Sequence, residues 1–305
     1  MNEIIHLKTI SDLYKFLHLG YAEHPLWGVV DFSMVKGHSE ELRIKTDFYS
    51  VMFKNHCRNH IRYGRNRLDF QDGSLVCIAP NHVISMEIDN GEQEEMMGWG
   101  LFFHPDLIRG SSLGNKMREY SFFNYEISEA LHLSEKEQQV LYDCIQKIRA
   151  ELTQNIDSFS QAITIANIEL LLQYAARFYG RQFITRKSAN RHVVSRVEQF
   201  LKAYFESNDH RNDGIPTVKE LAGQVHLSPS YLSDLLKKET GLNAQDHIHY
   251  FVIEQAKHIL IETNQSVSEI AYSLGFEYPQ YFSRLFKLKT GKTPMEFRSG
   301  NEKIS

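Results

Sequence analysis

Cysteine is scarce in this chain of 305 residues, which contains only three. Cys57, Cys77 and Cys144 are widely separated and form no C-x-x-C pair. This spacing argues against a disulfide framework and against a cysteine-based zinc site. We expect all three thiols to be buried, reduced packing residues, with redox sensing as the alternative.

Long apolar runs are absent as well. No segment approaches the roughly 20 apolar residues that a membrane-spanning helix needs. The segment from Met1 to Gly20 mixes charged and apolar residues, unlike a secretory signal. We therefore expect a cytoplasmic protein without a membrane partner. The apolar fraction of 42% is that of an ordinary folded protein, and the length suggests about two domains.

The chain also lacks a strong net charge and a recognisable catalytic signature. Its formal net charge is -4, and 14 basic residues face 14 acidic ones from Asn190 onward, so composition alone does not indicate nucleic-acid binding. We find no Ser/His/Asp arrangement, phosphate-binding glycine loop or paired carboxylates. We therefore expect a protein that is not an enzyme and uses no cofactor.

Short runs rich in Val, Ile, Phe and Tyr alternate with turn residues between Leu26 and Phe103, a pattern typical of β-strands. Many short strands at this spacing predict a small barrel or a sandwich, and a barrel would offer an internal cavity. The expected strands are 48–53, 60–63, 74–79, 82–88 and 99–103, with turns at 71–73 and 89–91.

Scattered histidines in the strand region raise the alternative of a metal-dependent enzyme. They include no H-x-H pair followed by a carboxylate, although two of them flank Cys57. Since 15 histidines in one chain produce some proximity by chance, we expect no metal site. The histidines considered are His56, His60, His82 and His104.

Two helices are expected after the strands. Ser134 and Glu137 have the spacing of a capping box, which starts the first helix. The second, at about 158–183, carries more apolar surface than a small barrel needs to cover, and we interpret part of it as a dimer interface. The alternative is that both helices simply pack on the barrel. The polar stretch 184–192 lacks periodicity and is predicted to be a linker.

One structural unit is written twice between Thr217 and Arg298. Residues 217–222 match 266–271 at an offset of 49, and 231–241 match 281–291 at an offset of 50. Two copies are too few for a solenoid, so we expect two small helical modules.

Each copy carries the signals of helix, tight turn and helix. A capping box starts each first helix and a proline starts each second helix. This spacing is that of the helix-turn-helix arrangement, whose second helix can enter the major groove of DNA. The residues are Thr217, Glu220 and Pro229 in the first copy, and Ser266, Glu269 and Pro279 in the second.

Helical periodicity gives each second helix an inner apolar face and an outer polar face. We expect the residues near the helix start to reach base edges and the later lysines to bind phosphates. If only one copy were present, a polar face that merely contacts solvent would be an equally good interpretation of this pattern. Because the pattern occurs in both copies, we favour DNA binding. The predicted DNA-binding residues are Ser230, Tyr231, Ser233, Asp234, Lys237 and Lys238 in the first copy, and Gln280, Tyr281, Ser283, Arg284 and Lys287 in the second.

The two copies differ at two positions. His226 stands where the second copy has Gly275, at a turn position where a left-handed conformation costs a non-glycine residue about 1 kcal/mol. Asp234 stands where the second copy has Arg284. We expect the arginine to contact guanine. We expect the aspartate to accept a hydrogen bond from a cytosine amino group or to hold a neighbouring side chain in position. The second copy is therefore predicted to be the more regularly built.

A family resemblance rests on residues 231–241, 270–276, 282–287, Gly291 and 293–298. Together they resemble the DNA-binding domain of AraC/XylS-type bacterial transcription regulators. The resemblance covers about 193–298, roughly a third of the chain.

The resemblance implies an α+β multidomain protein. Residues 193–305 would form an all-α DNA-binding domain, with two helix-turn-helix units joined by a helix at 243–263 that is about 30 Å long. Residues 1–183 would form a cupin-like β-barrel with dimerisation helices that binds a small-molecule effector. The implied partners are double-stranded DNA, the effector, a second copy of the chain and RNA polymerase. A constitutive regulator whose barrel only dimerises is the alternative.

Overall fold

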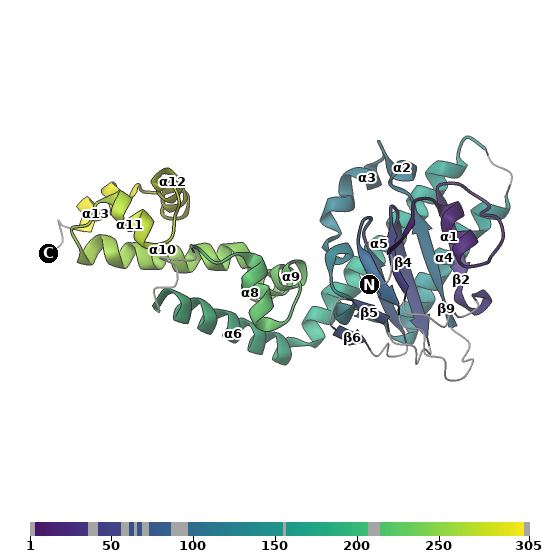
Figure 1. Ribbon diagram of the computed structural model, residues 1–305, viewed down its shortest axis with the longest axis horizontal. Coiled ribbons are helices and arrows are strands. Elements are labelled where there is room, and N and C mark those ends of the chain that lie inside the picture. The colour runs from purple at the N-terminus through teal and green to yellow at the C-terminus, as the bar shows by residue number, and fades with distance from the viewer. Residues whose placement is uncertain are drawn as a thin grey trace. The chain divides into compact units, whose positions relative to one another are not determined.

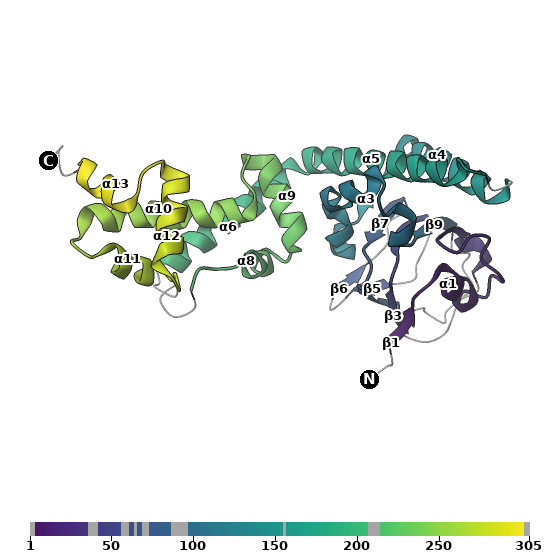
Figure 2. The same cartoon turned by 90° about the horizontal axis from the view of Figure 1, so that it is seen from above.

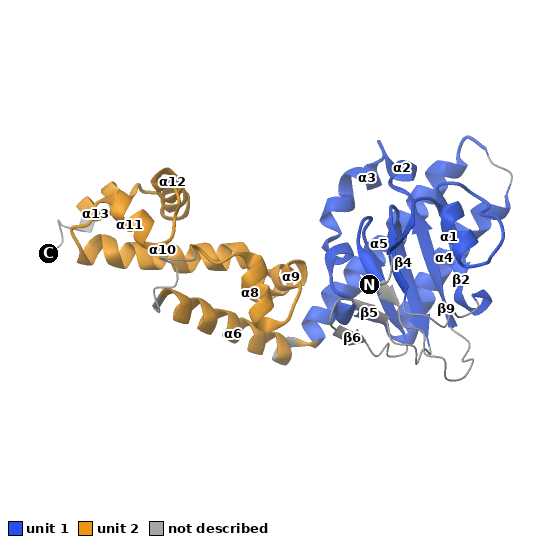
Figure 3. Ribbon diagram, in the orientation of Figure 1, with its two compact units in different colours: residues 1–185 blue, residues 186–305 orange. Residues whose placement is uncertain are grey.

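The computed structural model describes residues 4–35, 42–55, 61–63, 66–68, 73–86, 97–154, 157–206 and 214–301. The chain divides into two compact units, Met1–Thr185 and Arg186–Ser305 (Figure 3). Within the described ranges, no helix is long and apolar enough to cross a membrane.

The first unit is built on two five-stranded sheets (Figure 1). Strands β1 and β3 pair in parallel, and the other pairs are antiparallel. One sheet has the order β1 (Ile4–Leu7), β3 (Leu42–Thr46), β8 (Val83–Met86), β5 (Ile61–Tyr63) and β6 (Asn66–Leu68). The other has the order β10 (Leu131–His132), β7 (Ser74–Ile78), β4 (Tyr49–Asn55), β9 (Met97–Phe103) and β2 (Trp27–Asp31).

The described strands form two open sheets and no closed barrel. The edge strands of one sheet, β2 and β10, do not pair with those of the other, β1 and β6. The barrel expected from the strand spacing is therefore not confirmed, because strand spacing does not determine whether the edges of a sheet meet. The arrangement is closer to the sandwich that the same spacing allows.

A shared hydrophobic cluster lies between the two sheets. Leu7 and Ile44 from one sheet belong to the same buried cluster as Val30 and Phe102 from the other. Because successive side chains of a strand point to opposite faces, the alternate residues of β2 and β9 face away from this cluster. Those residues include Asp31 and its register partner Trp99, which lie on the opposite face of the second sheet.

Shorter elements connect the strands and helices of the first unit. They are the helices α1 (Ile10–Phe16), α2 (Pro105–Ile108) and α3 (Ser112–Lys116), and the 3-10 turns η1 (Phe32–Met34), η2 (Met117–Glu119), η3 (Ser121–Asn124) and η4 (Ile127–Glu129).

Two long helices, α4 (Glu135–Thr153) and α5 (Ser160–Thr185), lie side by side over the second sheet (Figure 2). The predicted capping box is present, since the backbone N–H of Ser134 donates to the Glu137 carboxylate at 2.9 Å. Arg181 of α5 binds the same carboxylate at 2.7 Å, which ties the two helices together. Both helices pack on the sheet, while Ile163 and Leu170 of α5 remain exposed.

The segment 184–192, predicted to be a linker, is helical. Helix α5 ends at Thr185 and α6 (Lys187–Glu206) begins after a single turn residue. The Asn190 amide is buried and donates to the Glu239 carboxylate at 3.1 Å. The segment contains good helix formers and a tertiary hydrogen bond, which apolar periodicity does not reveal, and the boundary between the two units lies inside it.

Some predictions about individual residues concern parts of the chain outside the described ranges. These are the turn at 89–91, most of the turn at 71–73, and the cluster of His56, Cys57 and His60. Cys77 and Cys144 are free and buried, as expected. In the part of the chain that the structure describes, no three His, Cys, Asp or Glu side chains gather as a metal site requires.

The second unit is entirely helical in its described part. The long helix α10 packs against the helix pair α8–α9 and against the pair α11–α12 (Figure 1). This confirms the two helix-turn-helix units joined by one helix. Its helices are α6, α8 (Val218–Val225), α9 (Pro229–Thr240), α10 (Ala244–Glu262), α11 (Val267–Ser273), α12 (Pro279–Thr290) and α13 (Pro294–Asn301).

Side-chain bonds connect α12 and α13 to α10 and to the residues that follow it. Arg298 donates to the backbone oxygens of Leu260 at 3.0 Å and Gln265 at 2.7 Å, which satisfies carbonyl groups at and just beyond the C-terminal end of α10. Lys289 pairs with Asp246 of α10 at 2.7 Å. Arg298 and Lys289 lie in the range that resembles the AraC/XylS-type domain, and both contribute to the packing of that domain.

Candidate nucleic-acid interface

Both first helices begin at reciprocal capping boxes, as predicted. The backbone N–H of Thr217 donates to Glu220 at 2.7 Å, and that of Ser266 donates to Glu269 at 2.7 Å. In turn, the hydroxyl of Thr217 or Ser266 accepts a hydrogen bond from the backbone N–H of its glutamate at 3.2 Å. The backbone bonds hold the pKa of both glutamate carboxyls below its ordinary value. The start of each helix is thus fixed by residues three apart in sequence.

The two tight turns have the same hydrogen-bond pattern. Leu227 donates to the Ala222 oxygen at 3.1 Å, and Phe276 donates to the Ala271 oxygen at 3.0 Å. His226 has φ 58° and ψ 42°, in the left-handed region. Its counterpart Gly275 has φ 85°. The predicted turn geometry is therefore confirmed, with a histidine held where glycine is favoured.

We expect His226→Gly to be neutral or to stabilise the folded chain by up to about 1 kcal/mol, because it relieves the left-handed strain. The matched change Gly275→Ala places a side chain at the equivalent turn and should destabilise by about 1 kcal/mol. Urea unfolding followed by helical circular dichroism measures both. A clear loss of stability in His226→Gly would contradict the strain argument.

The second helices, α9 and α12, have matching length and ends. Each has 12 residues and starts with proline. Each stops at a left-handed glycine, Gly241 with φ 82° and Gly291 with φ 77°. At the other end, the Ser228 hydroxyl accepts from the Tyr231 backbone at 3.2 Å, whereas Tyr278 at the start of α12 makes no such side-chain bond. The two helices therefore differ mainly at their N-terminal ends, where base contacts are expected.

The inner faces of both helices are buried as predicted. Leu232 and Leu236 in α9, and Phe282 and Phe286 in α12, are almost fully enclosed. Leu285 is only half-buried. Opposite them lie the polar positions. Lys237, Lys238, Gln280, Arg284 and Lys287 are exposed, and Ser230, Ser233, Asp234 and Ser283 are half-buried.

Tyr231 is the exception among the predicted DNA-binding residues. It is only 4% exposed, while its counterpart Tyr281 is 60% exposed. Helix α6, which lies outside the repeat, packs against α9. Equivalent positions of the two copies therefore need not be equally exposed, and periodicity within the repeat did not reveal this difference. Tyr231 belongs to the interior of the domain.

One surface residue was missed by the sequence reasoning. Tyr278 is exposed immediately before α12, and its ring lies edge-to-face with that of Tyr281, with centroids 5.7 Å apart. The two aromatic rings flank the start of α12. Its position in the sequence could have identified it, since Tyr278 directly precedes the proline that begins the helix.

Comparisons with known proteins agree with this geometry. Residues 221–300 match the family described as a helix-turn-helix domain. An uncharacterized HTH-type transcriptional regulator, YfiF of Bacillus subtilis (strain 168), is 21% identical over 299 residues, covering 98% of this chain and 88% of that protein. The arabinose operon regulatory protein of Escherichia coli (strain K12) is 37% identical over 95 residues, covering 31% of this chain and 32% of that protein.

A solved structure is similar to part of the chain. The C-terminal domain of AraT, a response regulator from Geobacillus stearothermophilus, is 29% identical and covers 35% of this chain and 84% of its own, with a TM-score of 0.31. The family match, the paired caps and the two turns all lie in the second unit. Residues 221–300 therefore form a helix-turn-helix domain of the AraC/XylS type.

Proposed function

We propose that the protein is a sequence-specific DNA-binding transcription regulator that places α9 and α12 in successive major-groove segments. The observation that carries the proposal is the duplicated geometry: two helices of equal length, with polar outer faces, both packed on α10. Helix α10 has 19 residues and is therefore about 28 Å long. This length suits two contacts about one DNA turn apart.

The charges on the outer faces suggest a division of roles. Arg284 is exposed in the first half of α12, where a guanidinium can bind both acceptors of a guanine. Lys237, Lys238 and Lys287 lie in the later turns, which suits phosphate contacts. Asp234 is half-buried in α9, and we assign it to a cytosine amino group or to positioning a neighbour. Gln280, Tyr281, Ser230, Ser233 and Ser283 complete the proposed contacts.

The relatives of this chain support a regulatory role. The arabinose protein is an operon regulatory protein and YfiF is an HTH-type transcriptional regulator. We extend this role to the present chain. The first unit, in this proposal, senses a small molecule and thereby changes how the DNA-binding domains are placed.

A homodimer is part of the proposal. Ile163, Ala166 and Leu170 are exposed along α5 at spacings of three and four residues, with half-buried Tyr174 continuing the line. Such a stripe is the seam that two helices bury against each other. Light scattering on the purified chain measures its mass in solution, and a monomer at working concentrations would argue against this seam.

Selection of bound fragments from genomic or randomised duplex DNA tests the proposed function. We expect enrichment of one sequence with two conserved segments about 10 base pairs apart, one for each helix-turn-helix unit. Binding should weaken steeply with salt, because phosphate contacts release counterions. Equal retention of all sequences would contradict sequence-specific recognition.

A further inference from the structure

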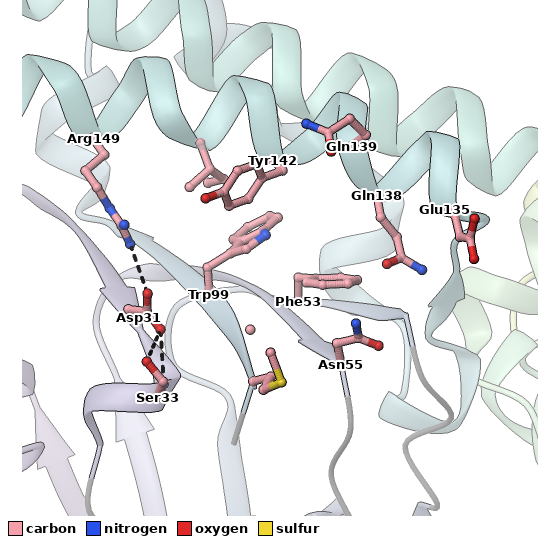
Figure 4. A pocket seen from close by; sticks show the side chains of 13 residues that line it. Asp31, Ser33, Phe53, Asn55, Trp99, Glu135, Gln138, Gln139, Tyr142 and Arg149 are labelled. Carbon is pink, nitrogen blue, oxygen red and sulfur yellow. Dashed lines mark hydrogen bonds and ion pairs between the residues drawn. The ribbon is translucent and has the colours of Figure 1, made fainter. Parts of the chain in front are cut away.

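A cavity of about 400 Å³ lies between the outer face of the second sheet and helix α4 (Figure 4). Strands β2, β4 and β9 form its floor and α4 forms its roof. It lies on the face of the sheet opposite the cluster shared by the two sheets, and so outside the interior where a barrel would hold a ligand. Its volume falls within the range of small-molecule sites. The residues that decide its chemistry are Asp31, Phe53, Trp99, Glu135, Tyr142 and Arg149.

Aromatic side chains form the centre of the cavity. Phe53 and Trp99 are register partners on β4 and β9, and their rings stack with centroids 5.8 Å apart at 28°. Tyr142 extends from α4 on the other side and is 47% exposed. The two sheet residues are buried and therefore fixed, whereas the tyrosine is positioned to close over a bound ring. This arrangement suits a flat, apolar molecule.

Charged groups lie near the two ends of the cavity. Arg149 approaches Asp31 at 4.0 Å, and Asp31 also accepts from the backbone N–H of Ser33 at 3.1 Å and from its hydroxyl at 2.7 Å. Within the described residues, Glu135 at the opposite end makes no ion pair. The lining therefore carries two carboxylates and one guanidinium. The excess negative charge favours a cation over an anion, and aromatic faces attract cations as well.

We propose that this cavity binds a planar aromatic molecule bearing a protonated amine, with its ring against Phe53, Trp99 and Tyr142 and its amine near Glu135. In the same pose an aromatic acid of the same size would place its carboxylate near Glu135, and in the reversed pose it would compete with Asp31 for Arg149, so it would bind less well.

A ligand bound in this cavity can affect the proposed dimer seam, because a short series of contacts connects the cavity to α5. The roof helix α4 packs against α5, and Glu137 of α4 binds Arg181 of α5 through two nitrogens, at 3.0 and 2.7 Å. A ligand that holds α4 against or away from the sheet therefore acts on the helix that carries the seam. This regulatory step rests on the proposed function, whereas binding in the cavity does not.

Saturation-transfer NMR on the full chain tests the site with tyramine and phenethylamine, each paired with its acid counterpart, phloretic acid and hydrocinnamic acid. We expect saturable binding of the amines and about tenfold weaker binding of the acids. Tyr142→Ala should weaken amine binding about fivefold, and Glu135→Gln should reduce the preference for the amine. Tyr21→Ala, at a site 95% exposed, and Glu119→Gln are the matched controls and should bind like the parent chain.

Each result bears on the site separately from the DNA-binding function. Amine binding that Tyr142→Ala and Glu135→Gln weaken supports the site, even if the chain selects no DNA sequence. No binding of either amine, equal binding by the variants and the parent, or stronger binding of the acids would overturn it. Variants are compared only after their circular dichroism and melting match those of the parent, and Tyr142→Phe provides a milder second variant that should retain binding.

Discussion

Replacing Arg284 with alanine should abolish the preference for one base pair while the rest of the recognition sequence stays the same. The side chain is exposed in the first half of α12, and within the described residues it makes no ion pair or hydrogen bond. Loss of a bidentate contact to guanine costs about 1–3 kcal/mol of discrimination. Binding of Arg284→Ala across a randomised library of sites measures this preference at every position.

The matched control is Lys287→Ala, one turn further along the same exposed face. A phosphate contact carries no base information, so this change should weaken binding to all sequences alike and lower the salt slope by about 1. If Arg284→Ala behaves in the same uniform way, the guanine assignment is wrong and Arg284 is a phosphate contact.

Replacing Phe286 with alanine should destabilise the second unit by about 3–5 kcal/mol. The side chain is fully buried, and its ring lies 5.8 Å from that of Phe282 and 5.4 Å from that of Phe297. It also belongs to the cluster that joins α10, α11 and α12, where α10 contributes Ile253 and Leu260. The cavity left by the ring would therefore weaken the contact that holds the second helix-turn-helix unit on α10.

Urea unfolding separates this effect from any change in the first unit. Both tryptophans of the chain, Trp27 and Trp99, lie in the first unit, so tryptophan fluorescence follows that unit and helical circular dichroism also reports the second. We expect the dichroism transition of Phe286→Ala to move to lower urea while the fluorescence transition stays. Leu288→Ala, at a site 77% exposed, is the control and should change stability by less than about 0.5 kcal/mol. Equal effects of the two changes would contradict the packing described for α12.

Several features of the second unit were predictable because they depend on neighbouring residues. The capping boxes at Thr217 and Ser266 involve groups three residues apart, and the left-handed turn at His226 follows from alignment with Gly275. The inner leucines and phenylalanines follow from helical periodicity. Each of these signals was repeated in the second copy, which made a chance match improbable.

Other features depended on segments that the sequence does not bring together. Tyr231 is buried in a domain where α6 packs on the first helix-turn-helix unit, although the repeat suggested an exposed side chain. The stretch around Asn190 is helical and makes a hydrogen bond to Glu239, some fifty positions away. The strands form two open sheets because pairing between edges depends on the whole sheet and not on the spacing of strands.

By itself the sequence determined the duplicated helix-turn-helix architecture, its caps and turns, and the type of domain it forms, since these are set within one or two helical turns. Only the tertiary structure decided which of two equivalent tyrosines is exposed, that α4 lies over the second sheet, and that Phe53, Trp99 and Tyr142 line a cavity there. Exposure and cavities arise where residues far apart in the chain meet, and no local pattern specifies that meeting.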